Sequence, residues 1–110
     1  MTDYGLSREI PLTDPRQVLW AKQRAERGFD DTELWNLDVT IAEFITPRLK
    51  AYAADVQGVP GTLKEEEWQK MLLLMVQAFE EYNGADFQNK TMRGKKGFKL
   101  FRKYFSNLWQ

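Results

Sequence analysis

Two groups of charged side chains in this sequence are candidates for catalysis or ligand binding. Paired carboxylates serve in general acid and base catalysis and bind divalent cations. Grouped cations bind phosphates, anionic membrane surfaces or acidic proteins. The carboxylates in question are Asp30, Asp31, Glu33, Asp38 and Glu43, and the cations are Lys95, Lys96, Lys99, Arg102 and Lys103.

The first carboxylates are better explained by helix formation than by catalysis. Asp30 and Glu33 have the spacing of a capping box, in which each side chain accepts a hydrogen bond from a backbone N–H near the other residue. Di-iron helical bundles add Glu-x-x-His motifs, whereas this sequence contains neither histidine nor cysteine. We therefore expect no catalytic residue, no metal site and no cofactor, and we expect that the protein is not an enzyme.

Asp38 and Arg48 form a separate pair of interest. Helical periodicity places both at the rim of an apolar face, and a buried or half-buried charge needs a partner. We expect Asp38 and Arg48 to have partners, either each other in a structural ion pair across Pro47 or, for the carboxylate, a lysine of the last helix. A role in ligand binding is the alternative.

The cations near the C-terminus belong to a segregated charge distribution. The whole chain of 110 residues carries 16 basic and 16 acidic side chains. Residues 88–110 hold seven of the basic ones and no acid, whereas residues 28–62 and 63–87 each hold six acids and two bases. These cations either solvate the outside of a terminal helix or bind a partner. For the second case we predict a surface formed by the five cations together with the aromatic residues Trp20, Trp35 and Trp109.

Helix signals organise the first half of the chain. Asp14 and Pro15 are typical of a helix start, and Gly28 is typical of a helix end. A second helix should begin at Asp30 and kink or restart at Pro47, giving segments 30–46 and 47–57. Its core face is expected to consist of apolar residues at steps of three, four and seven: Leu34, Leu37, Ile41, Phe44, Ile45 and Tyr52.

The second half contains two further helix patterns. A capping box of Thr62 and Glu65 predicts a third helix, which ends at Asn83–Gly84 and whose apolar residues make it the central helix. A fourth helix is expected from Gly94 to Leu108, with Phe98, Phe101, Tyr104, Phe105, Leu108 and Trp109 on one face and the cations on the other. Gly94-Lys95-Lys96-Gly97 is expected to be a flexible entry to this helix.

These patterns predict an all-α fold, a compact bundle of about four helices in a single domain over residues 1–110. The second helix is kinked at Pro47, the C-terminal helix is basic and amphipathic, and residues 1–13 form an irregular N-terminal arm. No apolar run is long enough to span a membrane and the polar start is not a signal peptide, so we expect a cytoplasmic protein.

Four segments of the chain resemble a family of small uncharacterised proteins encoded by tailed bacteriophages and prophages. The similarity spans most of residues 27–110, and the arm before Arg27 lies outside it. The resemblance implies that the protein is encoded by a phage and acts in the host-cell cytoplasm. It assigns no catalytic or binding residue to this sequence. The matching pieces are an Arg-Gly-Phe opening at Arg27, Trp-Asn-Leu-Asp at 35–38, Pro-Arg-Leu at 47–49, and the ending Gly97-Phe98-Lys99-Leu100-Phe101-Arg102-Lys103-Tyr104-Phe105-Ser106-Asn107-Leu108-Trp109.

Three functions fit these observations. The first is a protein-binding module that modulates a host or phage complex in host takeover or anti-defence. The second is a self-assembling structural or particle-associated phage protein, in which a homo-oligomer completes the burial of apolar residues. The third is a nucleic-acid-binding accessory protein that uses the C-terminal helix; it is the weakest, because the acidic remainder of the chain repels phosphates.

Overall fold

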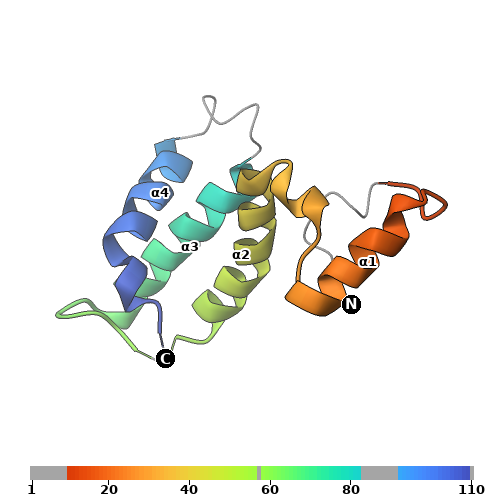
Figure 1. The fold of residues 1–110 in the computed structure, drawn as a ribbon. Helices are drawn as coiled ribbons and strands as arrows, with labels where there is room; N and C mark the ends of the chain where they lie inside the picture. Colours follow the sequence, from red (N-terminus) through yellow and green to blue (C-terminus); the bar gives the residue numbers. More distant parts are fainter. Residues whose placement is uncertain (1–9, 57, 83–91, 110) are drawn as a thin grey trace. The chain divides into compact units, whose positions relative to one another are not determined.

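The computed structural model describes residues 10–56, 58–82 and 92–109, and within these residues the fold is all-α with no strand. The elements in chain order are α1 (Arg16–Arg27), a 3₁₀ turn η2 (Asp31–Leu34), α2 (Leu37–Ala54), α3 (Glu65–Glu81), α4 (Met92–Tyr104) and a 3₁₀ turn η4 (Phe105–Asn107). Figure 1 shows their path along the chain. The predicted all-α class with four helices is therefore confirmed.

The chain groups into two compact units, Met1–Phe44 and Ile45–Gln110. The first contains α1, η2 and the first turns of α2, and the second contains the rest of α2 with α3, α4 and η4. A single domain over residues 1–110 stays a prediction. Of the predicted N-terminal arm, residues 1–9 lie outside the described part, and residues 10–13 are irregular as expected.

In the first unit, α1 begins and ends where its sequence signals predict. The Asp14 carboxylate accepts a hydrogen bond from the backbone N–H of Arg16 at 2.9 Å. At the other end Gly28 adopts a left-handed conformation with φ 86°, which glycine takes up without steric cost, and its N–H donates to the carbonyl of Arg24. The Gln17 side chain donates to the carbonyl of Ile10 at 3.1 Å, which ties the preceding segment to the helix.

The predicted second helix differs from the structure at its start and at Pro47. Residues 31–34 form a 3₁₀ turn, and the α-helix begins only at Leu37 and continues to Ala54. Pro47 lies inside this helix, so the division into segments 30–46 and 47–57 is wrong. Proline removes one hydrogen bond, to the carbonyl of Glu43, while the bonds on either side remain available to hold the helix together. A kink of the helix axis at Pro47 stays a prediction.

The core face expected for the second helix is also wrong in part. Four of its large apolar residues are substantially exposed, whereas Ala42, Leu49 and Ala53 are buried. The buried residues also recur at helical spacing, because this segment is apolar around much of its circumference. The four exposed members of the expected face are Leu34, Leu37, Ile41 and Phe44.

In the second unit, α3 provides the buried centre, as predicted. Its completely buried side chains include Trp68, Leu72 and Met75. The predicted cap of Thr62 and Glu65 is replaced by one two residues later, where the N–H of Lys64 donates to the carboxylate of Glu67 at 2.9 Å. The helix therefore begins at Glu65. Its predicted end at 83–84 lies outside the described residues, and the helix is described to Glu81.

Polar contacts connect α3 to the second half of α2. The side-chain amide of Gln69 donates to the carbonyl of Ala53 at 3.0 Å, and the Lys50 ammonium lies 2.5 Å from the Glu80 carboxylate. The same helix α3 also packs against α4, and Figure 1 shows α3 between α4 and the second half of α2. This packing determines which face of α4 is free to meet a partner.

Candidate partner-binding surface

The five predicted cations lie on the exposed side of α4. We call them the basic surface: Lys95, Lys96, Lys99, Arg102 and Lys103, all of which are exposed. At about 100° per residue these positions share one side of a helix. The structure therefore brings together the five cations that the sequence grouped.

Aromatic packing holds the opposite side of α4 against α3. The Phe79 ring lies 4.9 Å from the ring of Phe98 and 5.0 Å from that of Phe101, both edge-to-face. One turn further along, the rings of Trp68 and Tyr104 are 5.4 Å apart. Edge-to-face pairs of this kind add to the free energy gained by burial. The predicted inward face is present for Phe98, Phe101 and Tyr104, and it orients the cations outward, whereas the prediction is wrong for Phe105 and Trp109, which are exposed.

Gly97 allows the two helices to approach closely. A Cβ atom at this position would lie 2.0 Å from the carbonyl oxygen of Leu74 and 2.9 Å from the Cβ of Ala78. The expected flexible entry 94–97 is therefore wrong, because these residues lie inside α4 and Gly97 is buried. The close contact positions Lys95, Lys96 and Lys99 on a rigidly packed helix.

No carboxylate of the described residues lies within ion-pair distance of the basic surface. Lys99, Arg102 and Lys103 line an open hollow of about 430 Å³. The Lys103 ammonium also lies 5.3 Å from the centre of the Tyr104 ring, a cation–π distance. The three cations give this hollow a positive potential.

Two aromatic side chains follow the basic surface and are exposed. Trp109 is 71% exposed, and its carbonyl accepts a hydrogen bond from the Tyr52 hydroxyl at 2.9 Å. Phe105 is 64% exposed, although the sequence pattern placed it on the inward face. The α-helix ends at Tyr104 and a 3₁₀ turn begins at Phe105, so the 3.6-residue period no longer applies there. The exposure of Phe105 could therefore not be predicted from helical periodicity, because the helix ends one residue earlier.

Trp20 and Trp35 lie together in the first unit. Their rings meet edge-to-face at 5.9 Å, and the Arg16 guanidinium lies 5.0 Å from the Trp20 ring centre. Trp35 is half exposed, as a binding residue requires, whereas Trp20 is only 2% exposed. The prediction that Trp20 is an exposed contact residue is therefore wrong. It is a core residue, because its ring packs against Trp35 and is covered by Arg16.

Asp38 and Arg48 are both exposed on α2, not half-buried at the rim of a core face. Both side chains lie in solvent, so the desolvation argument for pairing them does not apply. Their mutual ion pair stays a prediction.

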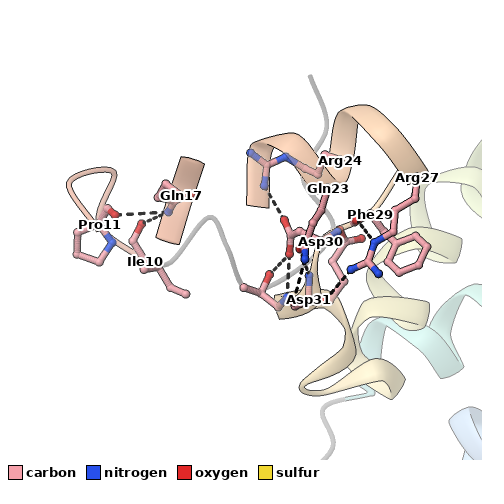
Figure 2. A network of polar contacts seen from close by, with 11 residues as sticks. Ile10, Pro11, Gln17, Gln23, Arg24, Arg27, Phe29, Asp30 and Asp31 are labelled. Atoms are coloured by element: carbon pink, nitrogen blue, oxygen red, sulfur yellow. Dashed lines mark hydrogen bonds and ion pairs between the residues drawn. The ribbon is translucent and has the colours of Figure 1, made fainter. Parts of the chain in front are cut away.

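The carboxylates near residue 30 build a structural network, shown in Figure 2. Asp30 is completely buried; its carboxylate accepts from the N–H of Thr32 at 2.9 Å and from the Thr32 hydroxyl, and it pairs with Arg24 at 2.5 Å. The Glu33 carboxylate accepts from the N–H of Asp30 at 2.8 Å, which completes the predicted capping box. Through these contacts the carboxylates of Asp30 and Glu33 stabilise η2. This agrees with the interpretation that they form the start of a helix.

Asp31 joins this network to α1. Its carboxylate accepts from the Gln23 amide at 2.9 Å and lies 2.6 Å from the Arg27 guanidinium. These two contacts, the Gln23 hydrogen bond foremost, lower the pKa of the Asp31 carboxyl below its ordinary value. The ionised form of Asp31 therefore stabilises the folded state.

The described residues contain no group of three or more acidic, histidine or cysteine side chains arranged to hold a metal ion. Nor does any helix among them have the length and apolar character needed to cross a bilayer.

No protein-family model, curated protein or solved structure matches this chain.

Proposed function

We propose that this protein is a phage-encoded, non-enzymatic binding module that contacts an acidic surface of a host or phage protein in the host-cell cytoplasm. The observation that carries the proposal is the basic surface, five exposed cations on one side of a helix whose other side is packed. The resemblance of segments 27–38 and 97–109 to phage proteins supports the setting.

The geometry supports recognition of an anionic partner in three ways. The cations are not neutralised by described carboxylates, so the positive potential is available to a ligand. The aromatic anchor of α4 on α3 holds the helix in place, which reduces the entropy lost on binding. Exposed Trp109 and Phe105 supply apolar area of the type enriched at the centres of protein interfaces.

The experiment is a capture assay with the intact protein in lysate of infected bacteria, compared with the triple variant Lys95→Glu/Lys99→Glu/Lys103→Glu. We expect the triple variant to lose the captured protein. The matched control reverses three exposed lysines outside α4, Lys22, Lys64 and Lys70, with the same change in net charge, and should retain it. Equal capture by both variants would contradict the proposal.

Nucleic acid is the competing anionic ligand, and a titration separates it from a protein. Duplex and single-stranded DNA are added to the protein at 50 mM and 200 mM salt. Binding that depends on the basic surface and falls steeply with salt would favour the nucleic-acid hypothesis over the protein-binding one.

A further inference from the structure

The hollow on the second half of α4 is lined by three cations that meet no anionic side chain of the described residues. Lys99, Arg102 and Lys103 line it, and its volume of about 430 Å³ falls in the range of sites that hold a small ligand. No described carboxylate lies within ion-pair distance of any of the three. The Lys103 ammonium lies over the Tyr104 ring, a contact that leaves its charge in place. The positive potential of the hollow is therefore available to a ligand.

The packing of α4 against α3 orders the backbone that carries these cations. Gly97 lies two residues before Lys99, and a Cβ there would meet the backbone of α3 at 2.0 Å. Phe101, between Lys99 and Arg102, has its ring 5.0 Å from that of Phe79. The backbone of the hollow is thus ordered before a ligand binds, which reduces the conformational entropy lost on binding.

The chain leads from the hollow directly into two exposed aromatic residues. Phe105, three positions after Arg102, is 64% exposed, and Trp109 is 71% exposed. The turn η4 that joins them is 3₁₀ and advances only about 2 Å per residue, so it keeps both at this end of α4. Tryptophan and arginine are the residue types enriched at the energetic centres of protein interfaces. We call this group the C-terminal site: Lys99, Arg102, Lys103, Phe105 and Trp109.

The dimensions of the basic surface favour a short anionic segment over a long polyanion. From Lys95 to Lys103 the surface extends about 12 Å along the helix axis, at about 1.5 Å per residue. Proteins that bind single-stranded nucleic acids follow the phosphate backbone over several nucleotides. Beyond the basic surface, the rest of the same compact unit, residues 45–87, carries seven acids and four bases. A continuing strand of phosphates would meet this net negative charge, whereas a short peptide would not.

We propose that the C-terminal site binds a short segment of the partner protein in which neighbouring carboxylates lie beside a large apolar side chain. The carboxylates enter the hollow, where Arg102 offers paired N–H donors and the two lysines offer compact positive charges. The apolar side chain packs on Phe105 and Trp109. This inference rests on the proposed function and deepens it, because it names the chemistry of the segment that the basic surface recognises.

The test uses the full chain and a fluorescein-labelled 12-residue peptide that contains four consecutive acidic residues next to a Trp-Leu pair. Fluorescence anisotropy at low salt should show saturable binding of this peptide. The same peptide with glutamines in place of the acidic residues should bind at least tenfold more weakly. The peptide with Ala-Ala in place of Trp-Leu should bind at least threefold more weakly.

Two pairs of lysines on α4 separate the hollow from the rest of the basic surface. Lys99→Gln/Lys103→Gln removes two charges from the hollow and should weaken peptide binding at least tenfold. The matched control Lys95→Gln/Lys96→Gln removes the same charge from exposed positions of the same helix outside the hollow, and it should leave affinity within threefold. Far-ultraviolet circular dichroism confirms that each variant is folded.

A substitution at Phe105 tests the apolar part of the site. Phe105→Ser should weaken binding of the Trp-Leu peptide at least threefold and leave binding of the Ala-Ala peptide unchanged, because the second peptide has no large side chain to pack there. The matched control Leu73→Ser changes a leucine of α3 that is 52% exposed, and it should affect neither peptide.

Four results would overturn the inference. They are no saturable binding of the acidic peptide, equal binding of the glutamine peptide, equal losses from the two pairs of lysine substitutions, and no loss in Phe105→Ser. Tighter binding of a 12-nucleotide single-stranded DNA than of the acidic peptide would also overturn it and assign the site to nucleic acid.

Failure of this inference is distinct from failure of the proposed function. If the acidic peptide does not bind but Lys95→Glu/Lys99→Glu/Lys103→Glu still abolishes capture from lysate, only the inference about the segment is wrong. If capture is unchanged in that variant, the proposed function itself is wrong.

Discussion

Asp30 and Asp31 are neighbouring carboxylates with different environments and therefore different contributions to stability. Asp30 is inaccessible to solvent and requires its contacts with Arg24 and Thr32, since an unpaired buried charge is costly. Asp31 lies nearer the surface and is held by Gln23 and Arg27. Both attach η2 to α1, and neither contact requires a ligand.

The lowered pKa of Asp31 predicts a pH-dependent contribution to stability. Since the folded-state pKa is depressed, the stabilisation is complete at neutral pH and is lost as the pH falls through the folded pKa. Asp31→Asn should therefore have a lower Tm than the wild type at pH 7, and the difference should begin to shrink below about pH 5 and continue to shrink below the ordinary carboxyl pKa of about 3.9. Thermal unfolding followed by circular dichroism measures it. A difference independent of pH would show that the charge of Asp31 contributes nothing.

At the scale of elements, the contact between α3 and α4 determines the orientation of the basic surface. Three aromatic pairs and the close approach at Gly97 hold one side of α4 inward. A helix with two glycines has low intrinsic propensity, so this packing supplies the order that propensity does not. The cations are exposed because the opposite side of α4 packs against α3.

Gly97→Ala tests this contact. Helix propensity predicts that the substitution stabilises the protein, whereas the packing against α3 predicts that it destabilises it. Alanine favours a helix by about 1 kcal/mol over glycine, whereas overpacking costs about 1–3 kcal/mol. The Cβ would meet a backbone oxygen at 2.0 Å, which cannot rotate away. We therefore expect a cost near the upper end of this range and a net loss of up to about 2 kcal/mol in the free energy of unfolding, measured by urea denaturation.

Gly58→Ala is the matched control for this substitution, since nothing lies within 4 Å of a Cβ at that position. It should be neutral or stabilising by up to about 1 kcal/mol. A Gly97→Ala protein at least as stable as the wild type would contradict the tight contact.

At the scale of the whole molecule, a net charge of zero conceals a segregated distribution of charge. Residues 88–110 hold seven basic side chains and no acid, whereas residues 28–62 and 63–87 each hold six acids and two bases. The five cations of the basic surface therefore lie in the one segment without an acidic side chain.

Ionic strength should control capture through the basic surface. Exposed charges are screened beyond a Debye length, which is about 10 Å at 0.1 M salt and about 3 Å at 1 M. Capture through the basic surface should therefore weaken strongly between 50 mM and 500 mM NaCl. Capture that is equally strong at both salt concentrations would contradict recognition by charge.

The sequence by itself determined the features that depend on residues close together in the chain. The Asp30–Glu33 capping box, the glycine stop at Gly28 and the two faces of α4 follow from hydrogen bonds or periodicity within a few turns. The five cations of the candidate site were found in the same way, since their exposure follows once the aromatic face of one helix is buried.

Only the tertiary structure decided which face of α2 is buried, where Trp20 lies and why Gly97 is required. Apolar residues surround much of α2, so periodicity alone favoured the larger residues, while the packing buries Ala42, Leu49 and Ala53. Trp20 is buried beside Trp35, fifteen positions further along the chain, and Gly97 faces the backbone of α3. These outcomes depend on neighbours distant in sequence, and a local pattern contains no information about the surface that a second element presents to it.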